Sequence, residues 1–224
     1  MTRLWTVEGA SAREVLVVSG HTSPVERVRF HSSENTLLCT AASDSSVRLW
    51  DVRSATQKSN GRIDVQASDI EWSTSPSSPH LLAVTERNGS VLVYDTRKLP
   101  HGSSASNKRT TGKSHDALHK FPLKPSLVEA CVFSPSSHHL VAATTSNSYG
   151  DLTIWNWKEK EAAKFLYPAH TGPIYSLAFS PDGSRLATGG SDALVGLWDV
   201  DSMVCTHTIT VSFRFSYLMK HVSP

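Results

Sequence analysis

The feature that most constrains this chain is a pattern of polar and aromatic residues that occurs twice, about 150 residues apart. In each copy a threonine precedes an aspartate by four positions, and a tryptophan follows that aspartate by six. A histidine precedes the aspartate by 23 positions in the first copy and by 22 in the second. Such internal similarity predicts a repeat architecture. The copies comprise His21, Thr40, Asp44 and Trp50, and His170, Thr188, Asp192 and Trp198.

The segments between these positions have the character of β-strands. Residues 25–30 alternate, and residues 36–41 and 46–50 are short apolar runs rich in β-formers. Clusters of serine, asparagine and aspartate separate them, as does Pro181-Asp182-Gly183 in the second copy. Each copy therefore predicts at least three strands, and the chain as a whole is predicted to be all-β.

The four polar residues of each copy are suited to form one hydrogen-bond relay. A Trp can only donate, a Thr hydroxyl accepts and donates, a neutral His does both, and an Asp accepts. We expect Trp50, Thr40, His21 and Asp44 to be linked in that order, and the second set likewise. Losing one partner of a buried network costs about 1–3 kcal/mol.

The same residue types also occur in catalytic triads. This interpretation is disfavoured because the set occurs twice, each time with a tryptophan, and because no Gly-x-Ser-x-Gly motif is present. Burial of His21 and His170 would exclude it. We therefore expect a structural network, no catalytic residues and no enzyme activity.

These residues resemble the WD repeat, whose pattern runs from Gly-His through Ser/Thr and Asp to Trp-Asp. The resemblance implies that each repeat of about 40–45 residues forms one four-stranded propeller blade. It holds at Gly20-His21 to Trp50-Asp51 and, with Ala169 before the histidine, at His170 to Trp198-Asp199. The expected fold is an all-β WD-repeat β-propeller.

Two degenerate repeats lie between these copies. In one of them Val84, Asn88 and Tyr94 stand where Thr, Asp and Trp belong, and no corresponding histidine is found. In the next, Trp155 is kept and Thr145 is in phase with the relay threonine. Blades without the relay depend on apolar packing, so we expect these two to be the less stable ones.

The repeats predict about four whole blades plus partial ones. Propellers typically close into a ring with about 4–8 blades. An unclosed ring leaves strand edges exposed. We therefore expect an incomplete propeller. Its origin would be a truncated gene model, a fragment of a longer protein, or a ring that a second chain completes. The expected divisions are a propeller at 1–212, with blades at 1–19 (partial), 20–60, 61–113, 114–167 and 168–210, and an atypical tail at 213–224.

Composition narrows the function classes. With 22 basic and 20 acidic residues the net charge is +2, which is no electrostatic footprint for nucleic acid. Cys39, Cys131 and Cys205 fall in predicted strands without metal-ligand spacing, so we expect reduced core thiols and no metal site. No signal sequence or membrane span is seen, and we expect neither a cofactor nor a small-molecule substrate.

The longest irregular stretch, residues 96–120, is rich in serine and positive charge. Such a loop is either functional or a mobile insertion between strands. Its basic residues Lys108, Arg109 and Lys113 are candidates for contact with RNA or an acidic partner. The absence of interleaved aromatic residues disfavours base stacking.

A closer resemblance, covering roughly residues 1–210, is to the WD-repeat subunit of the THO complex. It rests on residues 191–205, with the Asp-Ala-Leu-Val run and the Trp-Asp-Val-Asp continuation, and on residues 47–53 of the first copy. The resemblance implies a nuclear, non-catalytic scaffold that binds the helical THO subunits and an RNA export helicase within the larger TREX assembly. It implies a role in mRNP biogenesis and mRNA export, with mRNA bound indirectly or weakly.

Other functions remain open at this point. One is a different WD-repeat scaffold, such as a ubiquitin-ligase substrate receptor or a histone-binding adaptor, which would be recognised by its partners. Another is direct RNA binding through the basic loop, which would be sensitive to salt and to neutralisation of Lys108, Arg109 and Lys113.

Overall fold

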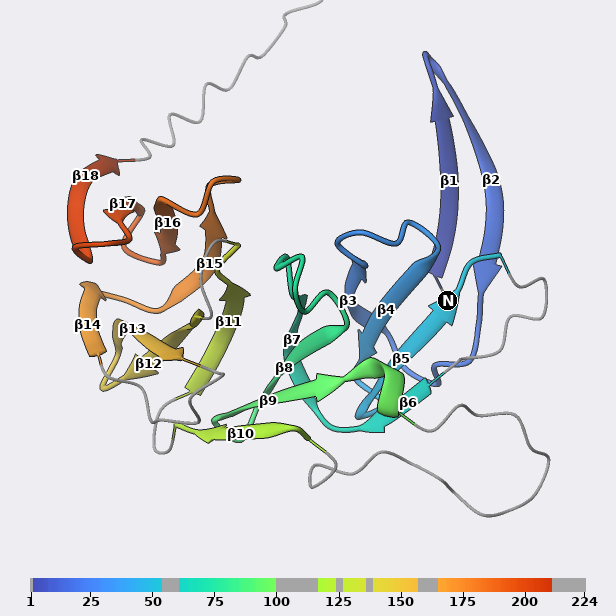
Figure 1. Cartoon of the computed structure of the whole chain (residues 1–224), viewed down its shortest axis with the longest axis horizontal. Helices are drawn as coiled ribbons and strands as arrows, with labels where there is room; N and C mark the ends of the chain where they lie inside the picture. Colours follow the sequence, from blue (N-terminus) through green and yellow to red (C-terminus); the bar gives the residue numbers. More distant parts are fainter. Residues whose placement is uncertain are drawn as a thin grey trace, which may run out of the picture.

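The computed structural model describes residues 2–53, 61–99, 117–123, 127–135, 139–156 and 165–210. These residues form five antiparallel sheets, of which four have four strands and one has two (Figure 1). A single-turn 3₁₀ helix, Thr96–Lys98, follows one strand. Within this described part of the chain, no helix has the length and apolar character needed to span a membrane.

The strands follow one another through each sheet in chain order, so every sheet is a simple meander. The two-stranded sheet comprises β1 (Thr2–Glu8) and β2 (Ser11–Val18). The next two sheets comprise β3 (Val25–Phe30), β4 (Leu37–Ala42), β5 (Ser46–Asp51) and β6 (Gly61–Asp64), and β7 (Ala67–Trp72), β8 (Leu81–Glu86), β9 (Ser90–Asp95) and β10 (His119–Pro122). The last two comprise β11 (Leu127–Phe133), β12 (His139–Ser146), β13 (Tyr149–Asn156) and β14 (Phe165–His170), and β15 (Ile174–Phe179), β16 (Arg185–Gly190), β17 (Leu194–Asp199) and β18 (Val204–Thr210).

The sheets are arranged as blades around an arc (Figure 1). The first strands of successive four-stranded blades contact each other, β3 with β7, β7 with β11 and β11 with β15. The arc is open between the β1–β2 pair and the β15–β18 blade in Figure 1. The described strands therefore form an incomplete β-propeller.

Apolar layers between neighbouring blades hold the arc together. One layer packs Cys39 and Val47 of the first four-stranded blade against Ile70 and Trp72 of the second. Similar layers join the second blade to the third and the third to the fourth. A smaller one packs Val18 of β2 against Leu38 and Trp50. Burial of apolar surface contributes about 25 cal/mol per Å². Burial of these faces therefore drives the packing of the blades against one another.

The sheets and the expected repeats divide the chain at different places. Because β6 pairs with β5 and β10 pairs with β9, the chain changes sheet after the fourth strand, whereas the repeats counted from the sequence begin at the histidine. The cuts expected at 60/61 and 113/114 separate each fourth strand from its sheet. The division of residues 1–212 into repeats remains a proposal, and the tail at 213–224 lies outside the described residues.

Candidate functional site

The first set of repeated residues is joined in the blade formed by β3–β6. Nε1 of Trp50 donates to Oγ1 of Thr40 at 2.8 Å. Nε2 of His21 lies 2.7 Å from the same oxygen, and Nδ1 of His21 lies 3.0 Å from Oδ2 of Asp44. The relay thus connects the segment before β3 with β4, the β4–β5 turn and β5.

The second set has the same geometry in the blade formed by β15–β18. Nε1 of Trp198 donates to Oγ1 of Thr188 at 3.1 Å, and Nε2 of His170 lies 2.8 Å from that oxygen. Nδ1 of His170 lies 2.9 Å from Oδ1 of Asp192. The structure therefore brings together all eight residues singled out in the sequence, four in each end blade.

The chemistry of the groups sets the direction of each relay. Because the Trp N–H can only donate, the Thr hydroxyl accepts from it and donates its own proton to His Nε2. The imidazole must then carry its proton on Nδ1 and donate to the carboxylate. Backbone N–H groups complete the carboxylate shell, from Thr22 to Asp44 at 3.1 Å and from Thr171 to Asp192 at 3.0 Å.

Burial and hydrogen bonding shift the pKa values in a direction that preserves this state. Burial lowers the pKa of His21, which outweighs the opposing effect of Asp44. Burial acts to raise the pKa of Asp44, but hydrogen bonds from Ser46, Thr22 and His21 outweigh it and lower the pKa to about 2. The relay therefore holds a neutral imidazole beside an ionised carboxylate at neutral pH.

Three residues that support the relays were not identified from the sequence. Oγ of Ser46 donates to Asp44 at 2.7 Å. A Cβ added at Gly190 would lie 2.5 Å from Nδ1 of His170, and one added at Gly196 would lie 2.8 Å from Oγ1 of Thr188. Two features of the sequence could have identified these glycines, namely a Gly-Gly pair after Thr188 and a glycine inside a strand. A glycine within a strand often marks a position that other atoms approach closely.

The two middle blades fill the same positions with apolar side chains. Strand register places Val84 where Thr40 lies and Tyr94 where Trp50 lies, as expected.

In the third four-stranded blade the expected phase of Thr145 is wrong. The β12–β13 hairpin is longer than its counterparts, and Thr145 pairs with Gly150 near the turn. Because Leu140 pairs with Trp155 as Leu38 pairs with Trp50, the threonine position is occupied by Ala142.

The burial of the relay histidines argues against a catalytic role for these residues. The side chain of His21 is 3% exposed and that of His170 is 2% exposed. Neither imidazole has a surface from which it could reach a substrate, and both nitrogens are already occupied by Thr and Asp. The triad-like residues thus have no free group for proton transfer.

Among the described residues, one cluster of potential metal ligands comprises His31 and Glu34 in the turn after β3 and His80 just before β8. Nδ1 of His31 accepts from the backbone N–H groups of Ser33 at 3.2 Å and Glu34 at 3.0 Å. The neutral ring must then carry its proton on Nε2, and neither nitrogen offers a free lone pair. His31 acts here as a cap for the turn, and its ring packs edge-on against Trp72.

The other candidates are placed as follows. The basic residues Lys108, Arg109 and Lys113 lie outside the described residues. Cys39 and Cys131 are buried, and burial raises their thiol pKa values. Cys205 is exposed, so its expected place in the core is wrong, because β18 is the outermost strand of its blade.

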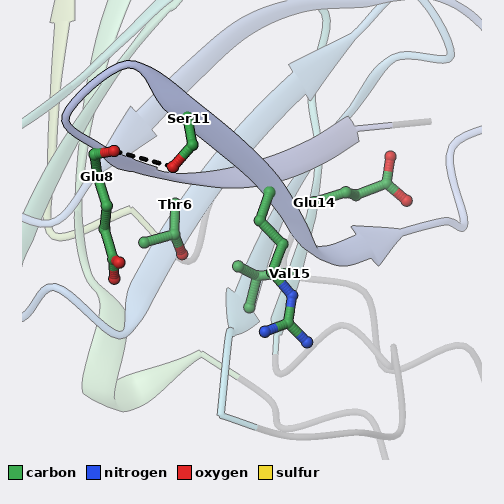
Figure 2. Close-up of a pocket in the computed structure, with 6 residues that line it drawn as sticks. Thr6, Glu8, Ser11, Glu14 and Val15 are labelled. Carbon is green, nitrogen blue, oxygen red and sulfur yellow. Dashed lines mark hydrogen bonds between the residues drawn. The ribbon is translucent and has the colours of Figure 1, made fainter.

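A pocket of about 460 Å³ lies on the β1–β2 hairpin (Figure 2). Among the described residues its lining comes from this hairpin, and Figure 2 shows Oγ of Ser11 donating to the backbone carbonyl of Glu8. Within that part of the chain, no second element contributes a converging group. It is lined by Thr6, Glu8, Ser11, Arg13, Glu14 and Val15.

Comparison with known proteins agrees with this geometry. The sequence matches the WD domain, G-beta repeat family over residues 12–51 and 162–199, the two stretches that carry the relays. The chain therefore contains two segments that match the WD repeat. The family model matches the two stretches that carry the relays. The middle blades form the same four-stranded sheets with different side chains.

Several WD-repeat proteins align with most of this chain. THO complex subunit 3 of Arabidopsis thaliana is 27% identical over 96% of the chain, which supports the resemblance to the THO subunit. WD repeat-containing protein AAC3 of Dictyostelium discoideum is 25% identical over 91%, and human serine-threonine kinase receptor-associated protein is 26% identical over 81%. The chain spans 64%, 40% and 44% of the lengths of these relatives.

Proposed function

We propose that this WD-repeat protein is a non-catalytic scaffold subunit of the THO complex, within the TREX assembly. The observation that carries the proposal is the alignment of 96% of the chain, including both degenerate middle blades, with THO complex subunit 3. A rigid arc of blades with long rims and apolar interfaces suits a docking platform. In this role the relays stabilise the blades through hydrogen bonds and take no part in a chemical reaction.

The proposed partners are the helical THO subunits and the export helicase, and the proposed location is the nucleus. The chain would act in transcription-coupled mRNP biogenesis and mRNA export. Contact with mRNA would be indirect or weak, and we assign to the chain no membrane, cofactor or small-molecule substrate. The alignments with AAC3 and the receptor-associated protein favour one alternative, a different WD-repeat scaffold such as a ubiquitin-ligase substrate receptor or histone-binding adaptor.

The test is affinity purification of the chain, tagged at its native locus, from nuclear extract, followed by mass spectrometry. Recovery of the helical THO subunits and the helicase is the expected result. Recovery of a ligase adaptor or of histones would replace the proposal with the alternative, and recovery of chaperones alone would contradict both.

A matched variant separates docking from folding. Asp192→Asn keeps the shape of the side chain but removes the charge that accepts from His170 and Thr171. We expect it to lower the stability of the last blade. Partner recovery should fall only to the extent that this blade loses its folded structure. If it keeps the melting temperature but loses the partners, the purely structural assignment of the relay is wrong.

A further inference from the structure

Each four-stranded blade carries a β-bulge near the start of its first strand, after the first residue of β3, β7 and β15 and after the second residue of β11. The register shifts between Val25 and Arg27, Ala67 and Asp69, Val128 and Ala130, and Ile174 and Ser176. A bulge leaves its extra residue outside the ladder and redirects the side chain. The four bulge residues are Glu26, Ser68, Glu129 and Tyr175.

These four side chains line two pockets at the place where the first strands meet. A pocket of about 390 Å³ includes Glu26, Glu129 and Tyr175 in its lining, and a pocket of about 380 Å³ includes Glu26, Ser68 and Glu129. Glu26 and Glu129 belong to both linings, so the pockets adjoin. Four blades thus direct side chains to one shared surface.

Two of the bulge residues are already engaged within the protein. Glu26 accepts from Nη2 of Arg87 at 2.7 Å, and Oγ of Ser68 donates to the backbone carbonyl of Val128 at 2.8 Å. The other two are not: among the described residues Glu129 makes no hydrogen bond or ion pair, and Tyr175 is 61% exposed. Glu129 and Tyr175 lie on β11 and β15, which contact each other.

The charge around the larger pocket is unbalanced. Nε of Arg29 donates to Glu71 at 3.0 Å and Nε of Arg27 to Asp69 at 3.3 Å, so these groups neutralise each other. Glu26 is matched by Arg87 from the neighbouring lining. The carboxylate left over is that of Glu129, beside an exposed phenol ring.

We propose that the pocket between Glu129 and Tyr175 binds a basic side chain, arginine or lysine, of a partner protein. The carboxylate supplies the counter-charge, and the aromatic face supplies a cation–π contact. The Arg27–Asp69 and Arg29–Glu71 pairs also line the pocket, and the arginines hold the acidic groups that would otherwise compete for the cation. This assignment does not depend on membership of the THO complex.

The test uses the purified chain and two capped tripeptides, Gly-Arg-Gly and its neutral isostere Gly-citrulline-Gly. Titration at low ionic strength is followed by NMR at the backbone amides of Ala130 and Ser176, which line the pocket. We expect millimolar binding of the arginine peptide, with the citrulline peptide weaker by about fivefold. Glu129→Gln should weaken the arginine peptide by a similar factor, and Tyr175→Ala by about threefold.

Glu8→Gln, on the exposed β1–β2 hairpin, is the matched control and should leave the affinity unchanged. Because Tyr175 is largely exposed and the Glu129 side chain has no partner in the part of the chain that the structure describes, both variants should keep the parent melting temperature. Equal binding of both peptides, full affinity of Glu129→Gln, or no binding at millimolar concentration would overturn the proposal. None of these outcomes bears on which complex the chain joins, so failure here is distinct from failure of the proposed function.

Discussion

The end blades and the middle blades of this propeller solve the same packing problem with different chemistry. In the β3–β6 and β15–β18 blades, a buried His, Thr and Asp hold the Trp of the third strand through hydrogen bonds. In the β7–β10 blade Val84 and Tyr94 occupy the positions of the relay threonine and tryptophan. Strand register and blade shape survive this exchange, so the relay is one of at least two ways to fill the position.

Burial sets the last blade, β15–β18, apart from the other four-stranded blades. Every residue of β8 and β9 is buried, because this blade has neighbours on both faces. All of β18, and most of β15, is exposed or partly exposed in the end blade. Apolar cover therefore stabilises the middle blades more than the last blade, where the relay adds stability to a blade with less cover. The order of blade stability depends on which contribution is larger.

The largest expected effect is that of Trp198→Ala in the last blade. The ring is 6% exposed and packs in the layer between the last two blades, so its removal leaves a cavity and takes away the hydrogen bond that Thr188 accepts. We expect a loss of about 3–5 kcal/mol. Hydrogen exchange resolved by strand should show the loss in β15–β18 first, and uniform loosening of all blades would contradict a local role.

A reciprocal exchange of threonine and valine probes the comparison directly. Thr40→Val keeps the side-chain shape but leaves Trp50 Nε1 and His21 Nε2 without partners, and we expect a cost of about 1–3 kcal/mol. Val84→Thr buries a hydroxyl within an apolar cluster, and we expect a similar cost. Denaturant unfolding monitored by strand-resolved exchange measures both variants.

The two outcomes together test whether each blade depends on its own set of residues. A neutral Thr40→Val would mean that the relay adds nothing beyond packing. A stabilising Val84→Thr would mean that the middle blade retains a partner for the hydroxyl and that the two kinds of blade are interchangeable.

The sequence predicted the parts of this structure that depend on local spacing. The relay residues are recognisable because Thr, Asp and Trp lie on one β-hairpin, where a fixed number of residues gives a fixed geometry. Thr145 was placed wrongly because a longer hairpin keeps the Thr–Trp spacing while changing the pairing, and spacing alone does not report register. The roles of Gly190 and Gly196 were missed because they depend on how closely side chains from other strands approach.

The surface formed by the bulges was beyond sequence analysis for a similar reason. Glu26, Ser68, Glu129 and Tyr175 share no residue type, and only the register shift common to the four blades relates them. Their convergence depends on the packing of β3, β7, β11 and β15 around the arc.

Acid should weaken the first relay in a defined pH window. Because burial lowers the folded-state pKa of His21, the unfolded chain binds a proton near pH 6.5 that the folded blade rejects. Stability from this group is present above about pH 6.5 and is lost as the pH falls below it. Asp44 adds a second loss as the pH falls from 3.8 toward about 2. Melting temperatures measured between pH 7.5 and 5.5 should decline.

The variant His21→Gln isolates the contribution of this group to the decline. It removes the titrating imidazole, so its melting temperature should be lower at neutral pH but should vary less between pH 7.5 and 5.5. The exposed His207→Gln is the matched control and should follow the parent. An unchanged slope in His21→Gln would assign the acid sensitivity to other groups.

The smallest expected effect comes from an ion pair between blades at the surface. Nη2 of Arg87 lies 2.7 Å from Oε2 of Glu26, and these side chains are 49% and 29% exposed. Solvent screening leaves such a pair worth about 0–1 kcal/mol, so Arg87→Gln should lower stability by less than Thr40→Val, and less still at high salt. Denaturant midpoints at two salt concentrations give the comparison. If Arg87→Gln cost as much as the relay variants, the charged rim would hold neighbouring blades together as firmly as the buried relay holds one blade.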